Sequence, residues 1–270
     1  MNEILTDLSP ATLAMAIEAN LIEFFRTLGC HPAVELHDDP EMLWASSSIR
    51  FALYNFVTRI RLTPDGADHA VEAAIARCKE RGMPMAWVTG PQTQPPDLSR
   101  RLQGHGFSTD DEPGMAADLL ALKEDWPVPS DLGIERVADA EALRIWSRVT
   151  TLGFGMPEAL STMFYDWFVH VGLDGSGPMR HYLGRLRGEP VATSTLFLGA
   201  GVTGIYRVAT LPDARGQGIG TAITLAALRE GRAEGYRVAT LHASPMGVNI
   251  YRRMGFQEYC TIGRYLWTGR

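Results

Sequence analysis

Two stretches of the chain share one layout of amphipathic helix, short strand, loop and second helix. The first copy reads HAVEAAIARCKERGMPMAWVTG and, after a Pro-rich loop, LSRRLQGHGF; the second reads TAITLAALREGRAEGYRVATLHAS and then PMGVNIYRRMGF. In both copies the first helix is closed by a glycine, Gly82 or Gly235, as a left-handed cap requires, and the second helix ends at Gly-Phe. The segments MAWVT and RVATLHA have the β-branched and aromatic content of buried strands. The repeat therefore predicts two copies of one α/β unit.

The segment LKEDWPVPSDLGIERV, residues 122–137, separates the two copies. It places two prolines and a glycine between apolar segments, which is typical of a linker. We therefore expect a first domain over 1–125, a linker over 126–131 and a second domain over 132–270. A length of 270 residues suits two domains of ordinary size, and 46% hydrophobic residues are enough for a sizeable core.

Upstream of its glycines, the second copy predicts strand, helix, helix and then three strands. The three strands lie in MRHYLGRLRGEPVATSTLFLGAGVTGIYRVATL, with turns at 187–188 and 199–201. An antiparallel meander that leads into a strand–loop–helix predicts an α/β fold. Its sheet is mixed, mostly antiparallel and flanked by helices, in two tandem copies.

The composition excludes several classes of protein. A net charge of -6 argues against a nucleic-acid binder that depends on bulk positive potential, although one local site can still bind an anion. Cys30, Cys78 and Cys260 lie far apart without metal-ligand spacing, so we expect reduced thiols and no metal. The N-terminus lacks a basic start with an apolar core, and no apolar run approaches the ~18 residues of a membrane span. These features predict a soluble, cytoplasmic protein.

The segment LPDARGQGIGTAI carries the clearest chemical signal. Pro212 ends a strand, and helical periodicity begins around 218–221. The first N–H groups of a helix lack partners within the helix, and the helix dipole is positive at that end. Gly216, Gly218 and Gly220 would let a bulky anion approach the backbone, and Arg215 adds a cation. This pattern predicts a phosphate or pyrophosphate cradle.

Other phosphate-binding loops do not match this segment. A Walker A loop is absent, and Thr221 stands where a dinucleotide fingerprint needs its third glycine. A plain strand–helix loop and a nucleotide-binding protein that uses the same glycines remain as alternatives.

The pattern Arg-x-x-Gly-x-Gly after VATLP resembles motif A of the GCN5-related N-acetyltransferases (GNAT). The segment LHASPMGVNIYRRMGF resembles motif B of that superfamily, in the correct order, and the resemblance covers residues 132–270. The first copy would be degenerate, because RLTPDGADHA holds a single glycine, Gly66, and no equivalent of Arg215. Leu102 stands there at the register of Tyr251.

The resemblance implies acetyl-CoA as co-substrate. Backbone N–H groups of Gln217, Gly218, Gly220 and Thr221 would bind its pyrophosphate, with Arg215 nearby. The strand at 208–210 would diverge from its parallel neighbour at 241–243 and pair with the pantetheine arm. The implied cofactor-binding residues are Val208, Ala209, Thr210, Arg215, Gly216, Gln217, Gly218, Ile219, Gly220, Thr221, Ser244 and Tyr251.

The resemblance also implies catalytic roles. The Val208 N–H would polarise the thioester carbonyl, and Tyr251 would protonate the departing CoA thiolate as general acid. Ser244 stands where the family often has Asn and would bond the cofactor or a water. Alternatively, Tyr251 simply packs on the sheet beside Ile250 and Met254, and Ser244 is an ordinary polar residue at a strand end.

The general base is the least defined part of the site. Many members of the superfamily carry a Glu on the strand before motif A, and Gly204 occupies that position here. Strand alternation puts 204, 206 and 208 on one face, so Tyr206 is the nearest polar candidate and Arg207 points to the other face. A water-relayed base, an amine that arrives neutral, His181 and His242 remain open.

The expected function is an acetyl-CoA-dependent N-acetyltransferase that acts on a primary amine of a small molecule by direct attack in a ternary complex. Phe154, Met156, Phe164 and Trp167 are available on the acceptor side, which favours an apolar or aromatic acceptor. We expect neither nucleic acid nor membrane as partner, and a homodimer is one assembly that the sequence allows. Another acyl donor, a protein N-terminus as acceptor and a non-catalytic acyl-CoA-binding module are the alternatives.

Overall fold

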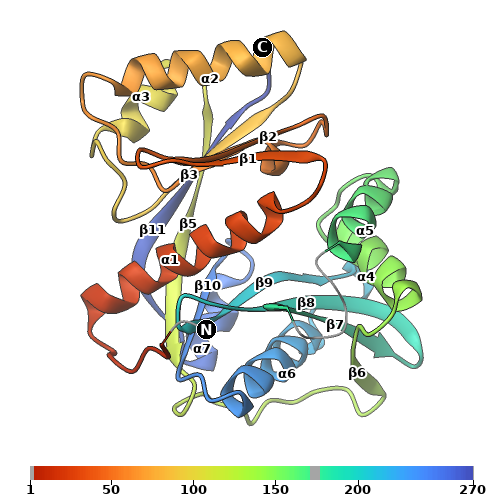
Figure 1. Cartoon of the computed structure of the whole chain (residues 1–270). Helices are drawn as coiled ribbons and strands as arrows, with labels where there is room; N and C mark the ends of the chain where they lie inside the picture. Colours follow the sequence, from red (N-terminus) through yellow and green to blue (C-terminus); the bar gives the residue numbers. More distant parts are fainter. Residues whose placement is uncertain (1–2, 171–176, 270) are drawn as a thin grey trace.

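A computed structural model describes residues 3–170 and 177–269 and contains one eleven-stranded sheet with helices packed on it (Figure 1). The strand order is β1-β2-β3-β4-β11-β5-β10-β9-β8-β7-β6. The strands are β1 Val34–Asp38, β2 Leu43–Ser47, β3 Phe56–Thr58, β4 Met85–Thr89, β5 Ser108–Asp118, β6 Leu132–Arg136, β7 Met179–Leu186, β8 Glu189–Gly199, β9 Val202–Thr210, β10 Val238–His242 and β11 Gln257–Trp267. The helices are α1 Pro10–Gly29, α2 Ala67–Arg81, α3 Leu98–Gly104, α4 Ala140–Gly153, α5 Ser161–Val169, α6 Ile219–Ala233 and α7 Val248–Met254, with single 3-10 turns η1 Ala52–Tyr54, η2 Glu158–Leu160 and η3 Pro212–Ala214.

Each half of the chain holds one parallel strand pair, β3–β4 in the first and β9–β10 in the second. The other neighbouring strands of the sheet are antiparallel. The predicted mixed, mostly antiparallel sheet flanked by helices is therefore confirmed.

The predicted local elements are also present. The strand MAWVT is β4, and the helix before it ends at Gly82 in the left-handed conformation, with φ 63°. Both expected hairpin turns of the meander have two consecutive residues at positive φ, Arg187–Gly188 and Ala200–Gly201. Such turns match the twist of the strands that they join.

The last strand of each half pairs with the other half. β11 lies between β4 and β5, with Tyr265 opposite Trp87 and Thr109, while β5 pairs on its other edge with β10. Figure 1 shows β5 and β11 running side by side from one half of the molecule to the other. The sheet is therefore continuous across the repeat, and each copy is completed by a strand of its neighbour. The boundaries 1–125, 126–131 and 132–270 remain predictions along the sequence.

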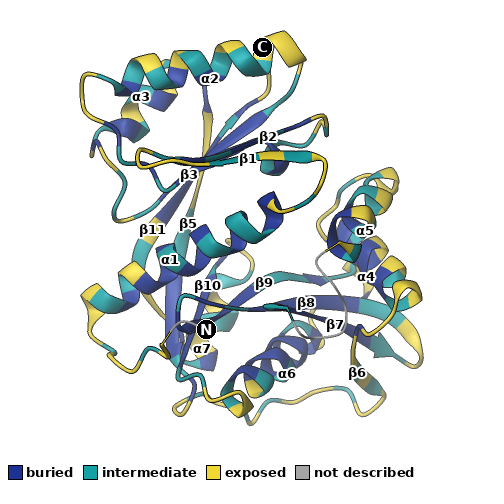
Figure 2. Ribbon diagram, viewed as in Figure 1, coloured by how far each residue is buried: buried dark blue, intermediate teal, exposed yellow. Residues whose placement is uncertain are grey.

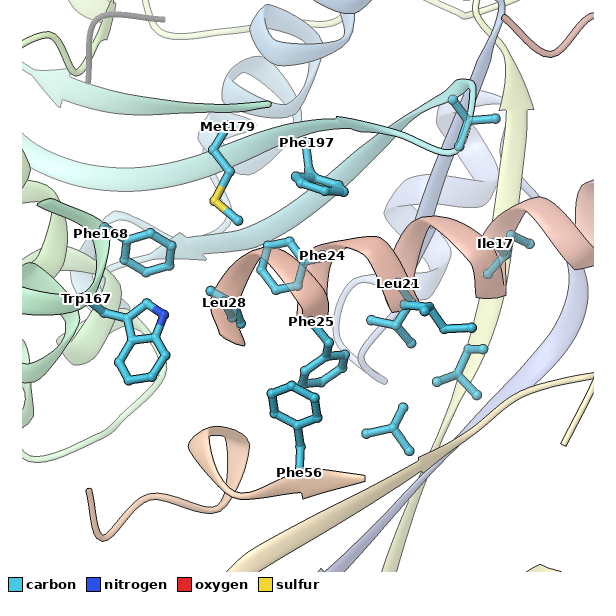
Figure 3. Packing of buried hydrophobic residues seen from close by; sticks show 14 of the residues in the cluster. Ile17, Leu21, Phe24, Phe25, Leu28, Phe56, Trp167, Phe168, Met179 and Phe197 are labelled. Carbon is cyan, nitrogen blue, oxygen red and sulfur yellow. The ribbon is translucent and has the colours of Figure 1, made fainter. Parts of the chain in front are cut away.

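Helix α1 fills the space between the two halves. The ring of Phe24 stacks on that of Tyr206 of β9, with ring centroids 4.0 Å apart. The Phe24 ring centroid also lies 5.5 Å from that of Phe197 of β8, and the Phe25 ring centroid lies 4.7 Å from that of Phe56 of β3 (Figure 3). The Asn20 side chain donates a hydrogen bond of 2.9 Å to the Gly199 carbonyl. The side chains of one helix thus pack into the cores of both halves.

Burial follows this arrangement. The inner strands are largely buried, whereas α2 exposes its outer side (Figure 2). Among residues 3–170 and 177–269, no helix combines the length and the apolar character needed to cross a membrane.

The strand exchange predicts that residues 132–270 do not fold alone. In that fragment β10 loses β5, and β11 loses both of its neighbours. We expect an insoluble or non-cooperative fragment. The control is the full chain cut at a protease site inserted after the exposed Ser130. Its two pieces should co-elute in size-exclusion chromatography and unfold together, since the exchanged strands still hold them. Cooperative unfolding of the isolated fragment would contradict the prediction.

Candidate functional site

The parallel pairing of β9 and β10 is short and covers three residues of each strand. The parallel ladder runs from Ala239–Thr203 to Leu241–Ile205 and stops there. Beyond it, the Ala243 N–H donates to the Pro113 carbonyl of β5, and the edge of β9 from Tyr206 onward faces a cavity. The divergence that was expected at 208–210 and 241–243 is present.

A β-bulge reshapes β9 at this point. Tyr206 lies opposite Thr195 and Ala209 opposite Thr193, so Arg207 and Val208 together face one residue of β8. Arg207 adopts φ 50°, a left-handed conformation that side chains other than glycine rarely take. As a result Tyr206, Arg207 and Val208 all line the cavity. The prediction that Arg207 points to the opposite face is wrong, because the bulge breaks the strand alternation on which it rested.

The cavity has a volume of about 370 Å³ and is built from both halves. α1 contributes Leu21, Phe24 and Phe25, and the second half contributes Phe154, Met156 and Phe164, three of the expected acceptor-side residues. The fourth, Trp167, is not among the lining residues. It is buried against Tyr54, with ring centroids 3.5 Å apart, and belongs to the core.

The glycine segment has the backbone of an anion cradle. Gly216 and Gly218 adopt φ 76° and 78°, and Gly218 precedes α6, whose N-terminus carries no side-chain cap. A Cβ at Gly216 would meet open space, whereas one at Gly218 would lie 2.6 Å from the Pro127 carbonyl oxygen. Ile219 and Thr221 are buried, so these residues offer a ligand their backbone N–H groups rather than their side chains.

Arg215 is held by the protein itself. Its Nε donates to the Thr210 carbonyl at 3.0 Å, and one Nη donates to the Gly153 carbonyl at 2.8 Å. The guanidinium therefore ties the end of β9 to the end of α4, close to the cradle. A Cβ at Gly153 would lie 2.8 Å from Ala209 Cβ, so α4 and β9 approach closely there.

Ser244 lines the cavity from the β10–α7 connection, and Tyr251 lines it from helix α7. Burial raises the pKa of Tyr251 to about 12, the nearby Glu112 acts in the same direction and a hydrogen bond with Thr224 opposes it. A phenol with this pKa stays protonated at neutral pH. The Ser244 hydroxyl accepts a hydrogen bond of 3.3 Å from the Gly247 N–H, so it also holds the turn before α7.

The geometry argues against Tyr206 as the proton acceptor. Its hydroxyl donates to Asn20 Oδ1 at 2.8 Å, and burial raises its pKa well above the ordinary value. The structure also explains why Gly204 replaces the family's Glu. A Cβ there would fall deep inside van der Waals contact with Asn20 Oδ1 and lie 2.6 Å from the Tyr206 ring. Asn20 of the first half therefore occupies the space that a Glu side chain would need.

Glu112 of β5 lines the cavity and was missed from the sequence. Its side chain is 14% exposed, and Oε1 accepts a hydrogen bond of 2.6 Å from Arg264 of β11, which also bonds Asp110 at 2.6 Å. Burial raises the pKa of Glu112, while Arg264 opposes this effect and Asp110 adds to it. In TDDEPGM this residue looks like part of an exposed acidic run, and only the strand exchange places it here.

The two histidines considered as bases differ in position. His242 lines the cavity, and burial together with Arg264 lowers its pKa to about 4, so it is neutral at pH 7. His181 lies buried beside Trp146, with Nδ1 at 2.9 Å from Thr195 Oγ1, and burial lowers its pKa to about 3. Neither histidine is a strong base in this state.

The corresponding gap in the first half is filled. After β3, the N–H of Leu62 donates to the Gln94 carbonyl, and the Gln94 N–H donates to Ile60. The Glu18 carboxylate of α1 accepts the Gln92 N–H at 2.8 Å beside them. Leu102, at the register of Tyr251, is fully buried. Among the described residues of the first copy, no open strand edge comparable to that of β9 is therefore present.

The comparisons with known proteins agree with this geometry. Residues 178–258 match a family model described as acetyltransferase (GNAT) domain. A GCN5-related N-acetyltransferase from Kribbella flavida is 19% identical with a TM-score of 0.68, over 93% of this chain and 96% of that chain. One from Sphaerobacter thermophilus is 16% identical with a TM-score of 0.60, over 96% and 93%.

A tandem GNAT protein from the clavulanic acid biosynthesis pathway is 15% identical with a TM-score of 0.57, over 98% of this chain and 97% of that chain. No curated protein matches the chain in sequence. At these identities the solved structures establish the fold alone. The GNAT resemblance inferred from the two motifs is confirmed, and the full-length match to a tandem protein agrees with two copies.

The contact of Gly204 with Asn20 predicts a non-additive pair of variants. Gly204→Ala should lower the free energy of unfolding by about 1–3 kcal/mol, because the new methyl group displaces a buried, hydrogen-bonded side chain. Asn20→Ala should destabilise the protein alone, yet the double variant should lose less than the sum. Urea unfolding measures all three. Gly133→Ala in β6, where a Cβ meets open space, is the matched control. Strictly additive losses would contradict the contact.

Proposed function

Residues 178–258 form an acetyltransferase domain of the GNAT family, and from this premise we propose that the protein transfers an acetyl group from acetyl-CoA to a primary amine of a small molecule. The observation that carries the proposal is the divergence of β9 from β10, followed along the chain by the uncapped N-terminus of α6. An unpaired strand edge suits the pantetheine amides, and a helix N-terminus suits the pyrophosphate.

On this proposal the backbone N–H groups of Gln217, Gly218, Gly220 and Thr221 bind the pyrophosphate. The dipole of the fifteen-residue helix α6 and the open space at Gly216 support this assignment. The edge of β9 from 208 to 210 pairs with the pantetheine. We assign Arg215 to holding the loop, because two carbonyls already engage its guanidinium.

The proposed chemistry is direct attack in a ternary complex. The neutral amine attacks the thioester carbonyl carbon, and the C–S bond breaks. The Val208 N–H stabilises the carbonyl oxygen as negative charge develops. Tyr251 gives its proton to the CoA thiolate, for which a pKa of about 12 keeps it protonated. The amine loses one proton and the CoA thiolate gains one. The reaction is balanced once the protein's proton acceptor and the Tyr251 hydroxyl exchange protons with water.

We assign Glu112 as the general base that takes up the proton of the amine. A carboxylate whose pKa is raised by burial is a stronger base than an exposed one, and Arg264 holds it in a fixed position. It faces the same cavity as Tyr251, Val208 and Ser244. The acid and the base would then come from different halves of the chain, which agrees with a cavity that both halves line.

Two matched variants test the proposed binding and chemistry separately. Gly220→Asp puts a carboxylate into the cradle, while its Cβ makes only an ordinary contact of 3.5 Å with Thr210 Oγ1. Stability should therefore stay within about 0.5 kcal/mol, and the Kd for CoA should rise at least about tenfold through charge repulsion. Tyr251→Phe should keep CoA affinity and lower kcat by about 10²-fold or more.

Calorimetry with CoA and thiol release from acetyl-CoA over a panel of primary amines provide the measurements. If CoA binds but no amine stimulates thiol release, and Tyr251→Phe changes nothing, the protein is an acyl-CoA-binding module and not a transferase.

Glu112→Gln tests the base. We expect kcat/KM to fall by about 10²–10⁴-fold. Glu112 accepts a proton only as carboxylate, so wild-type activity should decrease as the pH falls through its raised pKa, and the variant should lose this dependence. Asp110→Asn is the control, because Asp110 also pairs with Arg264 but its side chain is 55% exposed. An unchanged pH–rate profile in Glu112→Gln would remove Glu112 from the mechanism.

A further inference from the structure

Among residues 3–170 and 177–269, Arg207 is a cation without an acidic partner. Its Cζ lies 4.9 Å from the ring centroids of both Phe164 and Phe168 and 6.0 Å from that of Phe24. Its Nε is buried and makes no hydrogen bond, and within residues 3–170 and 177–269 it forms no ion pair. Other arginines with an unbonded buried Nε each pair with a carboxylate: Arg59 with Asp38, Arg180 with Glu230, Arg237 with Asp118 and Arg264 with Asp110.

Such an arrangement is costly. Taking a guanidinium out of water without a counter-ion costs several kcal/mol, of which contacts with aromatic faces recover only part. Burial lowers the pKa of Arg207, yet an arginine cannot release its proton in a protein. The left-handed backbone at φ 50° adds a further conformational cost, because side chains other than glycine rarely adopt it. A strained backbone that carries an uncompensated charge into a cavity is typical of a binding site.

The surroundings of Arg207 define what it can bind. The cavity wall beside it is aromatic, with Phe24 and Phe164. The carboxylates of Glu112 and Asp110 on β5 pair with Arg264 on β11. Arg207 instead lies beside the rings of Phe24, Phe164 and Phe168, and it interacts electrostatically with Tyr54 and His181. The cavity lining thus has an acidic pole at Glu112, whose carboxylate is paired with the neighbouring lining residue Arg264, an apolar body and a cationic pole at Arg207. A guanidinium binds a carboxylate through two parallel hydrogen bonds, which makes a carboxylate its preferred small anion.

We propose that the acceptor is an amine that also carries a carboxylate on an apolar or aromatic body, as an apolar amino acid does, and that Arg207 binds this carboxylate. That the ligand carries an amine rests on the proposed function. That it carries a carboxylate rests on the position and surroundings of Arg207. A cavity of about 370 Å³ accommodates a ligand of that size. The acceptor's amine would face Val208 and Glu112, and its side chain would pack among the phenylalanines.

The first test uses ligands that cannot react. 3-Phenylpropionate should raise the Tm of the protein, and its neutral amide, 3-phenylpropionamide, should raise it much less. Arg207→Asn should abolish the difference. Asparagine tolerates a positive φ, so this variant removes the charge and keeps the backbone. Equal effects of the two ligands on the wild type, or a difference that survives in Arg207→Asn, would overturn the anion site.

The second test uses turnover. Thiol release from acetyl-CoA is measured with phenylalanine and with phenethylamine, which differ only by the carboxylate. We expect the ratio of their kcat/KM values to favour phenylalanine in the wild type and to fall by about 100-fold in Arg207→Asn. The difference in intrinsic reactivity between the two amines cancels when the two ratios are compared, because the wild type and the variant are measured with the same amines.

Arg77→Asn is the matched control. Arg77 lies 4.4 Å from the Trp44 ring in the first half, away from the cavity, so its loss should leave the ratio unchanged. A wild type that prefers phenethylamine, or a ratio that is the same in Arg207→Asn, would overturn the proposal. If CoA binds and no amine of the panel is acetylated, the proposed transferase function fails, and the thermal shifts alone then decide whether Arg207 is an anion site. If other primary amines are acetylated and neither of these two is, the proposed acceptor class is overturned while the transferase function stands.

Discussion

The pairing of β5 with both β10 and β11 is the constraint on which the rest of the molecule depends. It places the last strand of each half in the sheet of the other, so neither half has a complete sheet of its own. It also sets Glu112 beside Arg264, because those residues lie two strand positions apart on the two exchanged strands, next to the gap that β9 and β10 leave. One backbone ladder therefore creates both the continuity of the fold and the acidic side of the cavity.

Helix α1 makes different contacts with the two copies of the unit, and the cleft beside β9 is open while the corresponding gap after β3 is filled. On the side of the second copy, Asn20 bonds Tyr206 and Gly199 and fills the space beside Gly204, while Phe24 forms part of the cavity wall. On the side of the first copy, Glu18 accepts a hydrogen bond from the loop that fills the gap after β3. Residues two positions apart on one helix thus help to fill the gap of the first copy and to shape the site of the second copy. The difference between the two copies follows from the contacts of helix α1, which both copies share, as much as from the missing glycines of the first copy.

The sequence predicts what depends on local chemistry. Periodicity, cap glycines and two-residue turns give the repeated units and the meander, and the alternating glycines with Tyr251 locate the open cleft. The exchange of β5 and β11 could not be predicted, since both strands fit either sheet and the choice depends on pairing between residues far apart in the chain. Glu112 was missed for that reason. Arg207 was assigned to the wrong face because one extra residue in β9, invisible in the sequence, reverses the alternation from that point onward.

The charges of the cavity are distributed in a way that bears on its chemistry. Arg264 is neutralised by two carboxylates of β5, so the acidic pole has an internal counter-ion and persists in the free protein. Arg207 has aromatic rings around it instead and no ion pair within the part of the chain that the structure describes, and on the proposal above the carboxylate of the acceptor is its counter-ion. On the proposed reaction, an amine that binds as a cation loses one proton before it attacks and a second one as the neutral amide forms, while the carboxylate is unchanged. The attraction to Glu112 then disappears while that to Arg207 remains. Substrate is held at both poles and product at one, which favours exchange of product for substrate without any movement of the fold.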